Sequence, residues 1–209
     1  FFGRVPFPAM HVDTGKKFPE MYAFRDRFAK EWDLDLRVEP CPPIDSVDPT
    51  LPPAARSAAR KTEGLKLALN KYGFDGLIAG IRRDEDPTRA KERWFSPRSA
   101  EGNWDYKDQP PEFWGQFASS APEGGHVRVQ PLLEWTELDI WEYIAREEIP
   151  LPSIYFSHER TVIERDGMLL SVGGPVVVED GEVPTKRIVR CRTVGDMSCT
   201  GAIASTATT

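Results

Sequence analysis

Cysteine is scarce in this sequence, and the few cysteines present do not form a recognisable site. The 209 residues contain three of them, Cys41, Cys191 and Cys199, which are far apart and odd in number. Such spacing is not a disulfide framework, and without a Cys-x-x-Cys pair it does not predict a zinc site. We therefore expect a reducing, cytoplasmic environment and no protein-held metal.

Long apolar runs and an excess of positive charge are also missing. No stretch approaches the roughly 20 apolar residues that cross a membrane, and no secretory signal is visible. The formal net charge of −6 argues against non-specific binding to nucleic acid, because no broad cationic surface is available to neutralise phosphates. The sequence thus predicts a protein that acts on neither membranes nor nucleic acid.

What is present is an alternation of strand and helix patterns. Apolar residues recur at spacings of three and four over 18–32 and 56–72, which predicts two amphipathic helices. Short apolar runs at 8–12, 34–38 and 76–79 predict strands, and the last of these is expected to be buried. Strand and helix in alternation predict a parallel sheet covered by helices.

The C-terminal half predicts further elements. Thr136 with Asp139 three residues later predicts the start of a helix. Two apolar runs joined by Asp180–Gly181 predict a small antiparallel hairpin that turns there. Residues 186–192 alternate basic and apolar side chains, which suits a strand with one cationic face.

The most charged stretch follows the strand predicted at 76–79. Six cationic side chains lie between Gly80 and Arg98, in a protein of negative net charge. Because ligands of open α/β folds bind at the carboxyl ends of strands, this concentration of cations predicts a local anion site. A solvated charged loop is the alternative, since acids interleave with the bases and can satisfy them.

A second predicted strand end carries polar groups. Asp13, Thr14 and Gly15 follow the run at 8–12, and two lysines come next. Asp13 is suited to accept a hydrogen bond from a ribose hydroxyl or an adenine amine, and the Gly15 backbone can approach a nucleotide closely. A plain turn is the alternative, because Asp and Gly supply turn geometry.

Several stretches in the same order resemble the small, catalytic subunit family of bacterial ATP-dependent sulfate adenylyltransferase. The Arg-Arg-Asp-Glu…Arg-Ala-Lys-Glu-Arg run is the most specific of them, and the resemblance covers most of the chain. The stretches are 11–22, 61–66, 80–93, 135–141, 164–169 and 192–195.

This resemblance implies a doubly wound parallel sheet with helices on both faces, of the ATP pyrophosphatase type that also includes phosphoadenylyl-sulfate reductases. It implies one domain over 1–209, in which 164–209 forms an extension over the substrate. The implied reaction converts ATP and sulfate to adenylyl sulfate and pyrophosphate, in sulfate assimilation. ATP and Mg²⁺ are the implied cofactors, and the implied partner is a GTPase large subunit in a heterodimer.

The resulting hypothesis assigns residues to roles. The residues that would hold sulfate and the phosphates are Arg82, Arg83, Arg89, Lys91 and Arg93. Those that would approach the nucleotide, orient the arginines, carry a Mg²⁺-bound water or close the site are Asp13, Thr14, Gly15, Gly80, Asp84, Glu85, Arg192 and Thr193.

Two neighbouring arginines of the basic stretch carry a more specific expectation. Side chains alternate in direction after a strand end, so one of Arg82 and Arg83 should face the nucleotide. The other should pair with Asp84, Glu85 or Glu92.

The sequence departs from the family in two places. A pyrophosphate-binding loop of the Ser-x-Gly-Lys-Asp-Ser type is absent, and so is a basic C-terminal tail. The sequence starts at Phe1 without a methionine, and we expect the complete protein to carry this loop before Phe1. Otherwise the chain has lost catalysis.

Three alternatives stay open. An adenylyl-sulfate reductase needs a nucleophilic cysteine on a tail, and Cys199 is the cysteine near the end. Its neighbours include no histidine or paired cysteine, so we expect Cys199 to be buried and dispensable. A non-catalytic nucleotide-binding subunit and an enzyme for a sister oxyanion are the other two.

Overall fold

The computed structural model describes residues 3–109 and 111–208. The chain divides into two compact units. Unit 1 comprises Phe1–Gly64 and Leu151–Thr209, and unit 2 comprises Leu65–Pro150. No helix in the described part of the chain is long and apolar enough to span a membrane.

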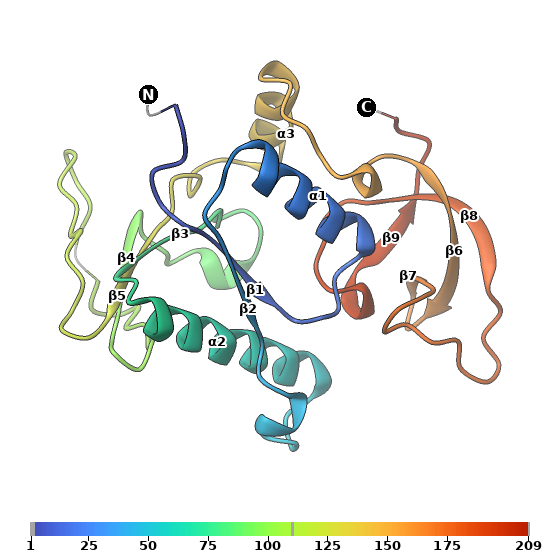
Figure 1. Ribbon diagram of the computed structural model, residues 1–209, viewed down its shortest axis with the longest axis horizontal. Helices are drawn as coiled ribbons and strands as arrows, with labels where there is room; N and C mark the ends of the chain where they lie inside the picture. Colours follow the sequence, from blue (N-terminus) through green and yellow to red (C-terminus); the bar gives the residue numbers. More distant parts are fainter. Residues whose placement is uncertain (1–2, 110, 209) are drawn as a thin grey trace. The chain divides into compact units, whose positions relative to one another are not determined.

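Unit 1 begins with two parallel strands joined by a helix. β1 (Ala9–Asp13) pairs with β2 (Leu36–Pro40), and α1 (Pro19–Glu31) connects them (Figure 1). Pro19 suits the first turn of α1, where its missing N–H leaves no hydrogen bond unmade. Phe18 and Phe28 are buried, which confirms the apolar face predicted from the helical spacing.

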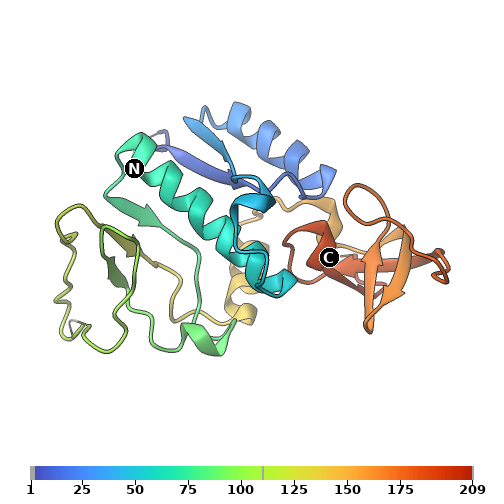
Figure 2. The same cartoon turned by 90° about the horizontal axis from the view of Figure 1, so that it is seen from below.

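The C-terminal strands of unit 1 close on themselves. β6 (His158–Arg165), β7 (Met168–Ser171), β9 (Gly201–Ala204) and β8 (Thr185–Cys191) are antiparallel neighbours in that order, and β8 returns to β6. Figure 2 shows these strands in orange and red. A buried apolar core gathers side chains from this ring, from the segments that precede and connect its strands, and from the residue before α1: Phe18, Ile154, Val162, Ile163, Leu170, Val176, Val189, Cys191, Met197 and Ala202.

The small antiparallel element predicted for the C-terminal part is confirmed, but the position of its turn is wrong. The chain turns at Asp166–Gly167, between β6 and β7, where both residues have positive φ angles of 50° and 74°. Around Asp180–Gly181 no strand forms in the described residues, and Val177 and Val183 are 70% and 73% exposed. Both Asp-Gly pairs carry the same turn signal, and only the first joins strands that bury apolar side chains.

Unit 2 contains a three-stranded mixed sheet. β3 (Gly76–Ile78) is parallel to the central β5 (His126–Val129), and β4 (Phe95–Arg98) is antiparallel to it. The prediction that β3 is buried is wrong, because β3 lies at the edge of the sheet and Ile78 is 55% exposed.

Two helices complete the description. α2 (Pro53–Tyr72) passes from unit 1 into unit 2. α3 (Glu137–Arg146) begins at the predicted position, where Thr136 and Asp139 form a capping box. Parallel strand pairs with connecting helices confirm the predicted α/β class, and the parallel strands are divided between two sheets.

Candidate functional site

The site residues predicted from sequence fall in both units, and each group is described within its own unit. Unit 1 contains Asp13, Thr14, Gly15, Arg192 and Thr193. Unit 2 contains Gly80, Arg82, Arg83, Asp84, Glu85, Arg89, Lys91 and Arg93.

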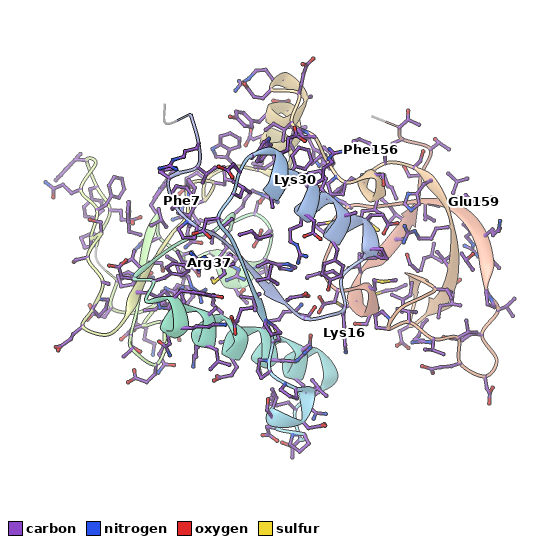
Figure 3. All side chains as sticks on the ribbon, in the orientation of Figure 1. Phe7, Lys16, Lys30, Arg37, Phe156 and Glu159 are labelled. Carbon is purple, nitrogen blue, oxygen red and sulfur yellow. The ribbon has the colours of Figure 1, made fainter. Side chains whose placement is uncertain are left out.

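The carboxyl end of β1 is an ordered turn. The Oδ1 atom of Asp13 accepts hydrogen bonds from the Gly15 amide at 2.8 Å and from the Tyr22 hydroxyl at 2.7 Å. Burial raises the pKa of Asp13, but these hydrogen bonds outweigh burial and leave the pKa below its usual value. Gly15 has a φ of 71°, and a side chain built there would meet nothing within 4 Å. An ionised carboxylate is therefore fixed beside backbone that a ligand can approach, and Lys16 follows on the same loop (Figure 3).

Asp196, which the sequence analysis does not single out, organises this end of unit 1. It is 1% exposed. Its carboxylate accepts from the Thr14 hydroxyl at 2.7 Å and binds the ammonium groups of Lys17 and Lys61 at 2.9 and 3.0 Å. Burial raises the pKa of Asp196, but the three donors lower it to about 2. The carboxylate is thus ionised and holds two cations, while the Thr14 hydroxyl is committed to it.

Arg60 adds a third cation to this cluster. Its guanidinium donates to the carbonyl oxygens of Thr14, Cys41 and Pro42 at 3.0, 3.4 and 2.5 Å, and none of these acceptors is charged. The side chains of Lys17 and Lys61 remain 21% and 39% exposed. Two lysines on a buried acid and an arginine on the neighbouring backbone thus bring three cations to the carboxyl end of a parallel strand, an arrangement suited to a polyphosphate.

The segment after β8 is anchored on the β1 loop. The Met197 amide donates to the Lys16 carbonyl at 2.8 Å, and Asp196 lies next to it in sequence. Arg192 and Thr193, which precede this anchor, are both exposed. The structure thus places the two predicted C-terminal residues on a segment that is tied to the predicted nucleotide loop.

The cysteines offer no activated nucleophile. Cys41 and Cys191 are buried, and burial raises the pKa of both thiols. The expectation that Cys199 is buried is wrong, because the 3-10 turn Met197–Cys199 buries Met197 and leaves the cysteine exposed. The Cys199 thiol donates only a weak bond of 3.4 Å to the carbonyl of Asp196.

In unit 2, the two neighbouring arginines of the basic stretch are both engaged. Arg82 Nε donates to Asp84 at 2.8 Å, as expected for the structural member of the pair. Arg83 is also engaged by protein groups: it pairs with the Glu134 carboxylate and donates to the Glu92 carbonyl at 2.8 Å. The two arginines therefore hold the loop in place as well as supplying charge.

Of the remaining basic residues, Arg89 ends a short 3-10 helix, and Lys91 and Arg93 follow it. A 3-10 helix, Pro87–Arg89, is capped by Asp86, which accepts from the Thr88 amide at 2.7 Å. Arg89 lies 3.7 Å from both Glu85 and Glu92. The Lys91 ammonium lies 4.3 Å from the centre of the Tyr106 ring. The Nε atom of Arg93 is buried and has no hydrogen-bond partner among the described residues.

Glu92 is the centre of a polar network inside unit 2. It is 1% exposed. Its carboxylate accepts hydrogen bonds from Ser96 Oγ at 2.9 Å, from Arg98 Nη2 at 3.1 Å and from the side-chain Nε2 of Gln130 at 2.8 Å. Burial lowers the pKa of Arg98 to about 10, although the Glu92 charge opposes the shift. The sequence alone predicts Glu92 only as an ion-pair partner of Arg82 or Arg83, since its burial depends on residues far along the chain.

The residues present do not fit a protein-built Mg²⁺ site. Among the described residues, no group of three or more His, Cys, Asp and Glu side chains could hold a metal ion. Asp84 is occupied by Arg82 and by the Glu137 amide, and Glu85 lies beside Arg89.

Residues 3–202 match the family model of the phosphoadenosine phosphosulfate reductase domain. A relative from Nocardia farcinica, sulfate adenylyltransferase subunit 2, is 52% identical over 99% of this chain and 68% of its own length. The same subunit from Psychromonas ingrahamii is 47% identical over 99% of this chain and 70% of its own. This chain belongs to the sulfate adenylyltransferase subunit 2 family. The resemblance seen in the sequence is thereby confirmed, together with its enzyme class, nucleotidyltransferase.

The family name "subunit 2" also implies a partner subunit. Among solved structures, Candida glabrata FMN adenylyltransferase in complex with FMN and an ATP analog covers 71% of this chain and 38% of its own, with a TM-score of 0.47 and 17% identity. The phosphoadenylyl-sulfate reductase of Candida auris covers 71% of this chain and 64% of its own, with a TM-score of 0.42 and 14% identity. Likeness at this level carries no argument about this chain.

Proposed function

We propose that this chain transfers the adenylyl group of ATP to sulfate, giving adenylyl sulfate and pyrophosphate. The observation that carries the proposal is the cationic cluster at the end of β1. There, Lys17 and Lys61 share the buried carboxylate of Asp196 beside the fixed carboxylate of Asp13. This arrangement supplies positive charge for a polyphosphate and an acceptor for the nucleoside at one strand end.

The chemistry requires no side-chain nucleophile. A sulfate oxygen attacks the α-phosphorus in line, the bond to the bridging oxygen breaks, and pyrophosphate leaves with its electron pair. Catalysis then depends on positioning and on neutralising charge in the transition state. The buried thiols of Cys41 and Cys191 are consistent with a reaction that forms no covalent enzyme intermediate.

The residues divide between the two reactants in this proposal. Lys17, Lys61 and Arg60 hold the phosphates of ATP, with the Gly15 backbone and Asp13 against the nucleoside. Thr14 acts through Asp196. The residues proposed to contact sulfate and the reacting phosphate, or to orient those that do, are Gly80, Arg82, Arg83, Asp84, Glu85, Arg89, Lys91 and Arg93.

We also propose a domain organisation and a partner subunit for this chain. Residues 1–209 form one domain of the ATP pyrophosphatase type, with 164–209 over the substrate and Arg192 and Thr193 closing the site. The anchoring of Met197 on the Lys16 carbonyl supports this role for the C-terminal segment. The mixed sulfate–phosphate anhydride lies uphill of ATP, so a GTPase large subunit in the cytoplasm is the proposed partner. The Mg²⁺ of the reaction is brought by ATP.

The test is sulfate-dependent release of pyrophosphate from ATP by the complete protein, with and without a GTPase subunit and GTP. Lys61→Met should lower kcat/KM for ATP about 10- to 150-fold, the equivalent of one charge-assisted contact. Lys30→Met is the matched control, because Lys30 is exposed on α1 (Figure 3). Equal kinetics for the two variants, or pyrophosphate release that ignores sulfate, would contradict the proposal.

A further inference from the structure

One face of the unit 2 sheet is polar and cationic where an apolar face is usual. Side chains alternate along a strand, so His126 and Arg128 on β5 and Gln130 just beyond it point to the same side. The register places Arg98 of β4 opposite His126, and Ser96 opposite Arg128. Paired residues of antiparallel strands share a face. Five polar side chains therefore line one side of this small sheet.

Three of these side chains leave a buried polar atom without a hydrogen-bond partner in the described part of the chain. The atoms are His126 Nε2, Arg128 Nε and Gln130 Oε1. His126 is 7% exposed and Gln130 is fully buried. Buried polar groups in folded proteins nearly always have a partner. His126 Nε2 and Arg128 Nε on β5, with Gln130 Oε1 just beyond the strand, can therefore form hydrogen bonds with a polar ligand.

The charge on this face has the sign of an anion site. Arg89, Arg98 and Arg128 lie around the carboxylate of Glu92, and Glu85 is a second carboxylate beside Arg89, so three positive charges meet two negative charges. The Glu92 carboxylate is already shared among Arg98, Ser96 and Gln130. Burial is the largest cause that lowers the pKa of Arg128, and the charge of Arg89 lowers it further, although Glu92 opposes both. Another anion on this face would relieve the excess of positive charge.

We propose that this face binds a small tetrahedral oxyanion of the sulfate class, with the guanidinium of Arg128 and the ring of His126 as donors. Arg89, tied to the same Glu92, brings the sequence-predicted basic stretch to this site. Gln130 Oε1 accepts a water that the oxyanion shares. The choice of sulfate among oxyanions rests on the proposed function, whereas the unpartnered atoms and the excess charge do not.

The first experiment measures binding without turnover. Equilibrium dialysis of radiolabelled inorganic sulfate against the whole chain, with and without a non-hydrolysable ATP analogue, should show saturable binding. Arg128→Gln should weaken it at least tenfold, and Arg128→Lys should weaken it less. The control is Arg146→Gln, because Arg146 is 70% exposed on α3 and pairs with Glu147. This control should bind sulfate within twofold of the unchanged chain.

Equal binding by Arg128→Gln and Arg146→Gln would overturn the assignment, as would no saturable binding by the unchanged chain. A second measurement uses the unchanged chain, so its result does not depend on whether a variant folds. In ring NMR spectra of the three histidines, sulfate should shift the His126 signals saturably and leave those of His158 in place. If His126 does not respond to sulfate, the proposal is wrong.

The outcomes separate this inference from the proposed function. If sulfate binds through Arg128 but ATP yields no sulfate-dependent pyrophosphate, the proposed reaction fails and the oxyanion site stands. If pyrophosphate release is normal and Arg128→Gln leaves the KM for sulfate unchanged, the reaction stands and the oxyanion site is lost.

Discussion

Each unit of the molecule buries a carboxylate among cations, and the two sites differ in how far the cationic side chains are exposed to solvent. Asp196 and Glu92 are both 1% exposed. The lysines on Asp196, Lys17 and Lys61, have side chains that are 21% and 39% exposed. Arg98, which holds Glu92, is only 3% exposed. The same pairing of a buried acid with cations thus gives a surface-facing platform in unit 1 and an interior network in unit 2.

The difference follows from the chemistry of the two cations. A lysine has a flexible stem and a compact ammonium group with rotatable donors, so it can bind a buried acid and still turn toward a ligand. An arginine has a planar fork whose donors point in fixed directions, which suits it to joining several buried acceptors. We expect the lysine cluster to bind through ammonium groups that reach the surface. We expect Glu92 and Arg98 to fix the basic stretch and to hold Arg128 in place for the proposed oxyanion.

The largest expected effect comes from removing the acid of the interior network. Glu92→Leu leaves Arg89, Arg98 and Arg128 without their shared carboxylate, and breaking a buried ion pair in this way costs about 3–5 kcal/mol of stability. Urea unfolding of the whole chain measures it. Glu147→Gln, at an exposed ion pair, should change the free energy of unfolding by less than about 0.5 kcal/mol. A loss below about 1 kcal/mol for Glu92→Leu would show that this acid is not the centre of the network.

A smaller loss is expected at the platform of unit 1. Asp196→Asn keeps an acceptor for Thr14 but loses the charge that holds Lys17 and Lys61, which should cost about 1.5–3 kcal/mol. It should also raise the KM for ATP, since the two ammonium groups are no longer fixed. Asp26→Asn at an exposed pair is the control. If the free energy of unfolding falls but the KM for ATP is unchanged, Asp196 has a structural role and no role in binding ATP.

Acid titration sharpens the same comparison. The pKa of Asp196 is lowered to about 2 from its ordinary value of 3.8, so its contribution to stability is complete above the unfolded value and disappears as the pH falls through about 2. The thermal midpoint of the unchanged chain should therefore drop more steeply between about pH 4 and pH 2 than that of Asp196→Asn. If the thermal midpoints of the two proteins fall in parallel with pH, the Asp196 carboxylate is not ionised in the folded protein as the low pKa requires.

The smallest expected effect is at Cys199, which belongs to neither cluster. Its thiol is exposed and makes only one weak hydrogen bond, so Cys199→Ser should change stability by less than about 0.5 kcal/mol. Pyrophosphate release should stay within twofold. A folded variant without activity would move the reductase alternative to first place.

Local patterns in the sequence were sufficient where the signal is itself local. The three-and-four spacing predicted α1 and most of α2, and the Thr136–Asp139 capping box located the start of α3. Where two local signals were equal, as at Asp166–Gly167 and Asp180–Gly181, the pairing of strands decided which became the hairpin turn. The exposure of β3 depends on its place at the edge of the sheet, which its own residues do not encode.

The candidate site was predicted only in part, for the same reason. The strand ends carrying Asp13 and Arg82 were recognisable because polar residues follow apolar runs. The bond between Thr14 and Asp196 joins residues 182 positions apart, so nothing near Asp196 in the sequence marks it as a hub. Arg128 reads as one alternating residue of a strand, and only the register with β4 shows how much positive charge gathers around it.

The closed ring of β6, β7, β9 and β8 affects how the protein would behave when it is partly unfolded. Each of these strands has a neighbour on both sides, so the ring presents no open backbone edge to another molecule. In contrast, β1 and β2 have one strand partner each, and so do β3 and β4 at the edges of the unit 2 sheet. Self-association through added strands, the usual first step of β-aggregation, should therefore begin at these four strands while the C-terminal ring stays inert.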